Sequence, residues 1–564
     1  MILSIVLLSM AALLIGYRFY ARIFSRQMEL DDSRITPATE INDGVDYVPA
    51  KMPLLLGQHF SAIAAAGPIV GPILSCMWFG WLPTLLWLIL GAIFIGGVHD
   101  FYSLVASIRH KAASIGEIVK QYTSPNVHIL FLIFVWLTLI YVIIAFTDIT
   151  ANTFQTFVEK AAYGPAVAAS SILYLFLAVI LGILLYHFKM RLSLATIIFV
   201  PLVLFIVWLG PKCPDCVLST LAKLSTKQWG IILLVYCFIA SVIPLWLLLQ
   251  PRGYLGGWML YAVIVIGFIG TFSGRFKVEY PALNLDGLHS LANGTLLIPT
   301  LFITVACGAC SGFHGVVCSG TTSKQLAKEK DAMPIGFGSM LLESLVGVLA
   351  LTTIMIMPKS ESLLKADPNF IYANGIARYL GLVGVKFSIA FPFALLVFST
   401  FVYDTLDVCT RLARYIFQEL TGLKGRMGGF VAAAASLFLP LVFLTITKEK
   451  AYLVAWPIFG TSNQLLASLT LLAISIWLIK TGKKAIYAIL PMVFMLFMTL
   501  WSLINLIKPL AHSLPAISRG ETVKTDIVIA GVCGLVLLLL SLFLIRETIK
   551  TLLLNRAKKG SALF

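Results

Sequence analysis

The sequence has few charged residues. Only 12% of its 564 residues are Asp, Glu, Lys or Arg, whereas 59% are hydrophobic, and the mean hydropathy is +0.96. This composition excludes a soluble enzyme or binding domain and indicates an all-α polytopic membrane protein. Acidic residues are the scarcer charge, 25 against 41 Lys and Arg. The positive-inside rule accounts for the basic excess, so no nucleic-acid partner is expected.

Other features are missing as well. The chain has no phosphate-binding loop, which disfavours an ATP-driven pump, and no cofactor is expected. It has no low-complexity tract, and its first apolar run continues past Tyr17 without the small-residue site of a cleavable signal. Most of the nine cysteines lie in apolar runs and are expected to be buried. Cys213 and Cys216 lie in a polar loop, where free thiols are favoured over a disulfide.

Apolar runs long enough to cross the bilayer, about 20 residues each, occur fifteen times. They lie near 2–24, 57–78, 82–108, 127–150, 164–187, 191–210, 229–250, 254–273, 298–320, 335–357, 386–408, 428–446, 451–479, 485–507 and 527–546. Alternate loops beginning with 25–56 and including one at Arg252, counted together with the span ends that adjoin them, hold 26 of the 41 basic residues. We therefore expect a cytoplasmic C-terminus and an external N-terminus.

The run 57–78 contains Gly67-Pro68 and Gly71-Pro72 in its middle. Each proline removes a backbone donor and crowds the preceding turn, so a straight helix is not expected. Lipid cannot satisfy the freed backbone groups, and the break must lie inside the bundle or line a cavity. Broken helices at this depth form substrate sites in many secondary transporters. The alternative is a proline kink with a packing role only.

The run 298–320 is the second candidate for a broken span, because it contains Gly308, Gly312, Gly315 and Gly320. It lies seven spans after the first broken run and must cross in the opposite direction. Two interrupted segments of opposite direction are typical of an inverted repeat with the binding site between them. The alternative is close helix packing through small residues.

Ionisable residues inside apolar runs are candidates for function. Two simpler interpretations stay open: Asp407 pairs with Arg411 or Arg414 on its own helix, and Asp100 pairs with Arg109 or Lys111. The candidates are His59, His99, Asp100, His314, Glu343, Asp404 and Asp407.

Cys307, Cys310, His314 and Cys318 have a spacing that invites a metal interpretation. On a continuous helix the outer two would lie about 16 Å apart, too far for one tetrahedral site. Only a glycine break could bring them together, and no metal is predicted.

Several long motifs resemble the CstA carbon-starvation family, in the family's order and over nearly the whole chain. They are His59-Phe-Ser-Ala-Ile-Ala-Ala-Ala-Gly-Pro-Ile-Val-Gly-Pro72, Gly97-Val-His-Asp-Phe101, Ser114-Ile-Gly-Glu117, Cys307-Gly-Ala-Cys-Ser-Gly-Phe-His314, Ser319-Gly-Thr-Thr322, Asp404-Thr-Leu-Asp407 and Trp456-Pro-Ile-Phe-Gly-Thr-Ser-Asn-Gln-Leu-Leu466. The resemblance implies a LeuT-like core of two inverted five-helix repeats in the inner membrane of a prokaryote. It also implies import of peptides, or of pyruvate with protons.

The mapping implied by this resemblance divides the chain into five parts. They are an N-terminal helix and loop (1–56), a first repeat (57–210), inserted helices (211–297), a second repeat (298–479) and two C-terminal helices with a tail (480–564).

The expected substrate-binding residues lie at the two breaks and on the run 451–479. They are His59, Ser61, Gly67, Pro68, Gly71, Cys307, Gly308, Ser311, Gly312, His314, Asn463 and Gln464. The expected ion-coupling residues are Asp404, Ser399, Thr400, His99, Asp100 and Glu343. Adjacent hydroxyls suit sodium, whereas Asp404 offers a titratable carboxylate, and the proton-coupled family members favour protons.

The sequence therefore predicts a secondary transporter of a small carboxylate-bearing nutrient within a lipid bilayer. The alternatives are a sodium-coupled symporter, a transporter-like nutrient sensor or a channel. Two broken helices fit alternating access better than a channel, and the tail carries no signalling module. The oligomeric state does not follow from the sequence.

The basic-residue asymmetry makes the topology testable. A cysteine introduced by Ser561→Cys should stay unlabelled by an impermeant thiol reagent in intact cells and become labelled after permeabilisation, because the C-terminus is cytoplasmic. Labelling of Ser561→Cys without permeabilisation would contradict this topology.

Overall fold

The chain folds into a bundle of helices. The computed structural model describes residues 1–158, 161–284, 297–447 and 452–561. Within them, β1 (Phe157–Val158) and β2 (Ala161–Ala162) form a short antiparallel pair. The helices are α1 (Ile2–Ile15), η1 (Gly16–Tyr20), α2 (Ala21–Met28), α3 (Pro37–Ile41), α4 (Met52–Ile63), α5 (Gly67–Phe79), α6 (Trp81–Gly91), η2 (Ala92–Gly96), α7 (Gly97–Arg109), α8 (Ile115–Tyr122), α9 (Pro125–Phe154), α10 (Tyr163–Tyr186), α11 (Leu192–Leu209), η3 (Gly210–Lys212), α12 (Asp215–Lys223), α13 (Thr226–Val242), α14 (Leu249–Phe272), α16 (Leu297–Thr304), α17 (Gly312–Val317), η4 (Cys318–Thr322), η5 (Glu329–Asp331), η6 (Met333–Gly338), α18 (Ser339–Met355), η7 (Ser362–Lys365), α19 (Pro368–Gly381), α20 (Phe387–Thr421), α21 (Gly425–Ile446), α22 (Tyr452–Lys480), α23 (Ile486–Ser518) and α24 (Thr525–Ser561).

Thirteen helices of the described residues are long and apolar enough to cross a membrane, or up to 14 if the bent pair α12–α13 counts as one span. The all-α polytopic prediction is confirmed, whereas the count of fifteen is not. Two predicted spans account for the difference. The span 229–250 is divided, because α13 is a 17-residue helix that ends at Val242 and α14 begins at Leu249. The span 298–320 is interrupted between α16 and α17.

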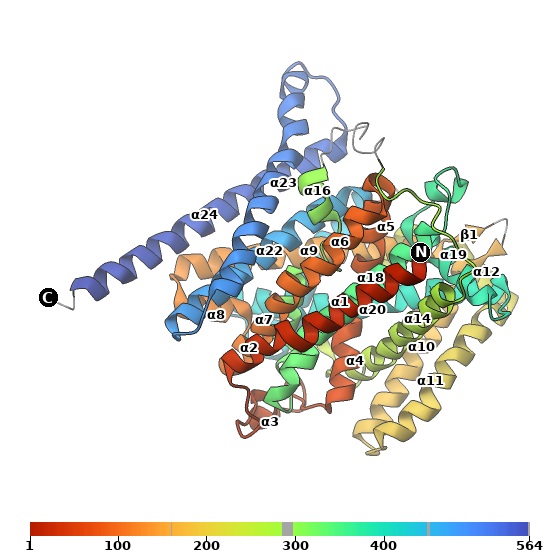
Figure 1. Cartoon of the computed structure of the whole chain (residues 1–564), viewed down its shortest axis with the longest axis horizontal. Helices are drawn as coiled ribbons and strands as arrows, with labels where there is room; N and C mark the ends of the chain where they lie inside the picture. Colours follow the sequence, from red (N-terminus) through yellow and green to blue (C-terminus); the bar gives the residue numbers. More distant parts are fainter. Residues whose placement is uncertain (159–160, 285–296, 448–451, 562–564) are drawn as a thin grey trace.

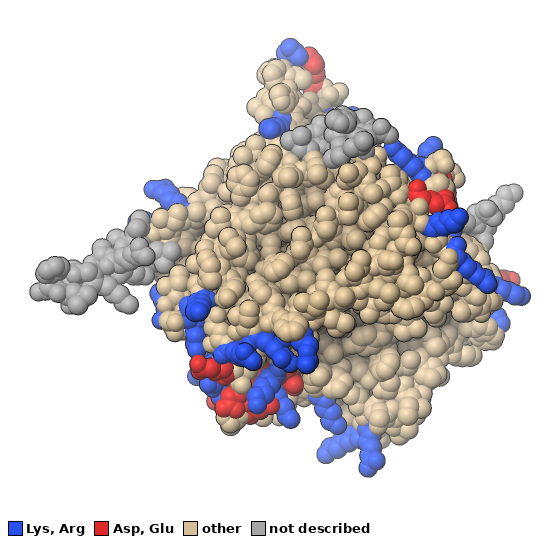
Figure 2. Space-filling view, in the orientation of Figure 1, with Lys and Arg blue, Asp and Glu red and all other residues tan. Residues whose placement is uncertain are grey.

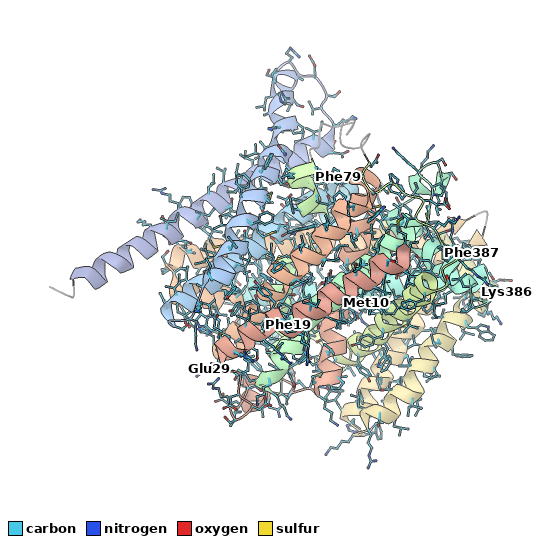
Figure 3. The ribbon with its side chains drawn as sticks, in the orientation of Figure 1. Met10, Phe19, Glu29, Phe79, Lys386 and Phe387 are labelled. Atoms are coloured by element: carbon cyan, nitrogen blue, oxygen red, sulfur yellow. The ribbon has the colours of Figure 1, made fainter. Side chains whose placement is uncertain are left out.

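The helices run roughly along one direction (Figure 1), so their ends form two faces. Charged side chains gather at the margins of the visible face, and a broad uncharged area lies between them (Figure 2). Glu29 and Lys386 lie toward opposite ends of the bundle, with Met10 and Phe19 of the first span between them (Figure 3). This distribution is the one expected of a protein that spans a bilayer.

Burial separates central helices from peripheral ones. In the most apolar window of each span, 94% of the residues are buried in α20, 89% in α4–α5 and 83% in α18, but only 28% in the spans of α1, α11 and α24. A helix that is apolar all round and buried belongs to the centre of a bundle. Polar residues on α4, α18 and α20 therefore face protein rather than lipid.

The loop before α4 is fixed to the bundle by Asp46. Its carboxylate lies 3.2 Å from Arg411 and 3.9 Å from Arg414 of α20, and Tyr415 donates a hydrogen bond of 2.5 Å to it. Burial raises the pKa of Asp46, but the charges of Arg411, Lys324 and Arg414 and the hydrogen bond from Tyr415 together lower it, so the net shift is downward. The expected pairing of Arg411 with Asp407 is therefore wrong, because the loop supplies a carboxylate that local spacing could not reveal.

The lowered pKa of Asp46 makes its contribution to stability depend on pH. A carboxylate whose pKa is lower in the folded state stabilises the fold above its unfolded pKa of about 3.9, and this stabilisation is lost as the pH falls through the folded pKa. Asp46→Asn should lower the free energy of unfolding by about 1–3 kcal/mol at pH 7, measured by thermal unfolding in detergent. The difference from wild type should shrink below about pH 4.

Glu40→Gln, on the exposed part of the same loop, is the matched control and should change little. An Asp46→Asn variant as stable as wild type at pH 7 would show that the pairing stabilises nothing.

Candidate functional site between two broken helices

The two broken segments lie side by side and run in opposite directions. Just before α4, the backbone N–H of Ala50 donates to Gln325 just after η4 at 2.9 Å. Beyond α5, the N–H of Leu82 donates at 3.0 Å to Ala282, in the chain that leads to α16. Hydrogen bonds thus connect the start of one segment to the end of the other, so the two segments are antiparallel.

The breaks touch each other at their midpoints. The first is the turn Ala64–Ala66 between α4 and α5, and the second separates α16 from α17. A Cβ atom on Gly67 would lie 2.4 Å from the Cβ and Sγ atoms of Cys307, and one on Gly71 would lie 2.5 Å from the carbonyl oxygen of Thr304. Only glycine permits this approach.

Asn463 and Gln464 of α22 satisfy the backbone of the second break. The side-chain oxygen of Asn463 accepts a hydrogen bond of 2.8 Å from the N–H of Phe313, and its amide donates to Ser311 at 3.0 Å. The Gln464 amide donates to the carbonyl of Cys310 at 2.9 Å. Both residues were expected at the substrate site, and the structure places them as supports of the break itself.

Helix α20 supports the first break in the same way. Thr405 donates a hydrogen bond of 2.7 Å to the carbonyl of Ala62, and Ser61 donates to the carboxylate of Asp404. His59 links the two segments, because its Nδ1 atom lies 2.8 Å from the Thr322 hydroxyl on η4. Polar side chains from α20 and η4 therefore hold the first break in place.

A buried arginine, Arg252, pairs with Asp404. The guanidinium of Arg252 on α14 lies 2.5 Å from Asp404 and 2.7 Å from Asp407, and Tyr236 donates a hydrogen bond of 2.7 Å to Asp407. Arg252 is fully buried. Its assignment to a cytoplasmic loop is therefore wrong: the chain re-enters the bundle earlier than hydropathy indicated, and α14 begins at Leu249.

A second buried group contains acids and imidazoles. Asp100 accepts a hydrogen bond of 2.9 Å from Nδ1 of His314, its other oxygen lies 2.7 Å from Nδ1 of His99, and the Nε2 atom of His314 lies 3.2 Å from Glu343. The side chains of all four residues are fully buried. The expected pairing of Asp100 with Arg109 is wrong, because Arg109 pairs with Glu329 instead.

The remaining candidates have simpler surroundings. Ser399 and Thr400 each donate to the carbonyl one turn back at 2.8 Å, which leaves their oxygen lone pairs for a further contact.

Within the described ranges, the group of His, Cys, Asp and Glu residues that could hold a metal is Glu117, His128 and Glu419, with ligand atoms within 4.8 Å of one another. The cysteine–histidine run does not form such a group.

The sequence did not identify three buried polar residues, Arg252, Ser103 and Ser107. Arg252 was hidden by its position between two apolar runs, although Gln250 two residues earlier marks the same polar interruption. Ser103 and Ser107 follow His99 at intervals of four and are fully buried, a spacing that predicts one helical face. Contact between helices decides what that face meets, so the spacing did not identify a site.

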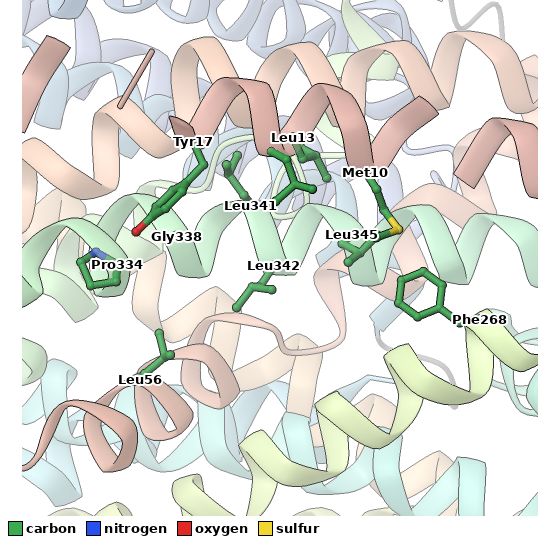
Figure 4. A pocket seen from close by; sticks show the side chains of 11 residues that line it. Met10, Leu13, Tyr17, Leu56, Phe268, Pro334, Gly338, Leu341, Leu342 and Leu345 are labelled. Carbon is green, nitrogen blue, oxygen red and sulfur yellow. The ribbon is translucent and has the colours of Figure 1, made fainter. Parts of the chain in front are cut away.

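Two cavities differ in character. One of about 420 Å³ lies at the end of the bundle that carries α8, hereafter the α8 end, and its polar lining includes Glu117, Ser319 and Lys324. The other, of about 380 Å³, lies between α1 and α18 and is lined by Tyr17 and apolar side chains such as Met10 and Leu341 (Figure 4). The second lacks the convergent polar groups of a substrate site.

Antiparallel broken helices held by polar side chains inside a polytopic bundle are the arrangement of a membrane transporter. The model of the family described as carbon starvation protein CstA matches residues 1–371 and 358–502. The chain belongs to this family, whose named relatives are transporters and not enzymes.

Three relatives illustrate the similarity. The peptide transporter CstA of Helicobacter pylori (strain J99 / ATCC 700824) is 32% identical, over 88% of this chain and 80% of the relative. That of Bacillus subtilis (strain 168) is 32% identical, over 86% of each chain. The pyruvate/proton symporter BtsT of Escherichia coli (strain K12) is 30% identical, over 88% and 81%.

Among solved structures, a manganese transporter of Eremococcus coleocola with a bound aromatic bis-isothiourea substituted compound has a TM-score of 0.48 at 12% identity. The match covers 91% of this chain and 98% of that one.

The contact between the breaks can be tested by enlarging its glycines. Gly67→Leu or Gly71→Leu should abolish uptake, because any side chain here forces the breaks apart, while the protein still inserts and elutes as a single species from a gel-filtration column. Gly381→Leu is the matched control, since a Cβ there meets nothing within 4 Å. Near wild-type uptake by either variant would contradict this prediction and show that the Gly-Pro pairs have a packing role only.

Proposed function

We propose that this protein imports a small nutrient bearing a carboxylate, a peptide or pyruvate, together with protons, across the cytoplasmic membrane of a prokaryote during carbon starvation. The observation that carries the proposal is the direct contact of two antiparallel broken helices, Gly67 against Cys307, at the centre of the bundle. The relatives' names narrow the substrate to peptides or pyruvate. The C-terminus lies in the cytoplasm, as the loop charges predict.

The geometry supports binding of a carboxylate between the breaks. Helix α5 begins at Gly67, and the N-terminal end of a helix carries a partial positive charge that favours an anion. Helix α17 begins at Gly312, beside Ser311, whose hydroxyl is hydrogen-bonded to Asn463 in the present structure. When the two segments separate, these groups become available to a carboxylate.

Alternating access then requires the two segments to move against each other. The joints that would change are the ones that now connect them, His59 with Thr322 and Gly67 with Cys307. The supports on α20 and α22 move with the break that each one holds. A fixed site with moving halves is the usual mode of inverted-repeat transporters.

Sodium coupling is the second candidate, and one observation favours it. Ser399 and Thr400 retain free lone pairs at adjacent positions of α20, and sodium, as a hard cation, prefers oxygen ligands. We favour protons, because Asp100 and Glu343 are fully buried and their ion-pair partners in the described part of the chain are histidines.

The proposal is tested by uptake into proteoliposomes of the full chain. Labelled pyruvate and labelled dipeptides are supplied with and without an outside-acid pH gradient, in sodium or choline buffer, with the membrane potential clamped. One unit of pH should drive about tenfold accumulation per coupled proton, because one pH unit equals a tenfold concentration ratio in free energy. Replacing sodium by choline should change nothing. Uptake that requires sodium and ignores pH would overturn proton coupling.

A further inference from the structure

Glu343 occupies an unusual position for a carboxylate. It lies in the second turn of α18, near the middle of the span Glu329–Met355, with no exposed surface, and neither of its oxygens has a hydrogen-bond partner among the described residues. It is near the second break, close enough to Cys307 and Cys310 to interact with both electrostatically. A buried carboxylate without a cation is costly when charged, so this position suits a group that holds a proton.

Asp404, the expected proton carrier, has different surroundings. It lies 2.5 Å from the guanidinium of Arg252 and accepts a hydrogen bond from Ser61. An arginine does not lose its proton in a protein, so its charge keeps compensating Asp404 throughout a cycle. Asp404 is therefore suited to holding α4 against α20 and α14 and not to carrying a proton.

From Glu343 a chain of titratable groups leads away from the break. The Nε2 atom of His314 lies 3.2 Å from Glu343, and its Nδ1 atom lies 2.9 Å from Asp100, whose other oxygen lies 2.7 Å from Nδ1 of His99. Within the described part of the chain, His59 of α4 and the thiols of Cys307, Cys310 and Cys318 also interact electrostatically with members of this group.

Beyond His99 the chain continues along one face of α7. A Cβ on Gly315 would lie 3.0 Å from the Nε2 atom of His99 and 3.1 Å from the hydroxyl of Ser103, so these two atoms point to the same spot. Both atoms lack a hydrogen-bond partner within the described residues, and water is the common partner of such buried polar atoms. One turn further, the Ser107 hydroxyl donates to the carbonyl of Ala113 at 2.8 Å and lies 3.2 Å from that of Ser319, and both of these residues line the 420 Å³ cavity at the α8 end.

We propose that Glu343, His314, Asp100 and His99 form a proton relay from the second break to the cavity at the α8 end, with Glu343 as the group that holds the coupling proton. This inference rests on the proposed proton-coupled import. Protonated Glu343 gives its proton to Nε2 of His314, which gives its Nδ1 proton to Asp100. Asp100 passes this proton to the unprotonated Nδ1 atom of His99 in its Nε2–H tautomer, and the Nε2 proton of His99 leaves through the Ser103–Ser107 face to water. Each group gains one proton and loses one, and rotation of the imidazoles resets the relay.

The test separates proton coupling from substrate movement. Glu343→Gln, a neutral group of the same shape, should abolish accumulation driven by a one-unit pH gradient, from about tenfold in wild type to no accumulation. It should keep counterflow exchange of labelled substrate at equal pH on both sides, because exchange needs no net proton movement. Glu361→Gln, whose carboxylate pairs with Arg378 outside the centre of the bundle, is the matched control and should accumulate like wild type.

Two further variants keep the test decisive if Glu343→Gln is poorly folded. Glu343→Asp should restore part of the gradient-driven accumulation, and Ser103→Ala with Ser107→Ala should slow gradient-driven uptake without slowing counterflow. A wild-type protein that ignores the pH gradient overturns proton coupling and the relay with it. A wild-type protein that responds, together with a Glu343→Gln variant that still accumulates substrate, overturns the relay alone.

Discussion

The structure depends on satisfying backbone groups where two helices break inside a membrane. Lipid offers no hydrogen-bond partner, so an interrupted helix needs partners supplied by the protein. Asn463 and Gln464 supply them to the second break, and Thr405 supplies one to the first. The helices that carry these side chains, α20 and α22, are accordingly among the most buried of the described bundle. The central position of the site is a consequence of this requirement.

Buried charged side chains, like the broken backbone, need partners supplied by the protein. The buried carboxylates are divided between two groups with opposite chemistry. Asp404 and Asp407 share Arg252, whose permanent charge makes that group a structural joint between α14 and α20. Asp100 and Glu343 face histidines instead, so the charge of their group changes with the number of protons it holds. One bundle thus contains carboxylates paired with an arginine and carboxylates paired with histidines.

Several features could be predicted from the sequence for identifiable reasons. The apolar composition determines a polytopic helical protein, and the Gly-Pro pairs and clustered glycines locate both breaks, because these residues act on the backbone locally. The span count was less predictable. Hydropathy reports length and apolarity but not where the chain turns, so it merged the end of α13 with the start of α14 and placed Arg252 in a loop. The predicted repeat boundaries and the LeuT-like arrangement stay predictions.

By itself, the sequence determined that the chain forms apolar helices, where two of them break and that several ionisable residues lie inside the bundle, because each depends on residues near one another in the chain. Only the tertiary structure decided which polar residues meet. Asp100 lies nine residues from Arg109 yet contacts His314, and Arg411 lies four residues from Asp407 yet contacts Asp46. In a buried site the partner of a charge is chosen by which helices pack together, and a compensating group from a distant helix can be closer than one on the same helix.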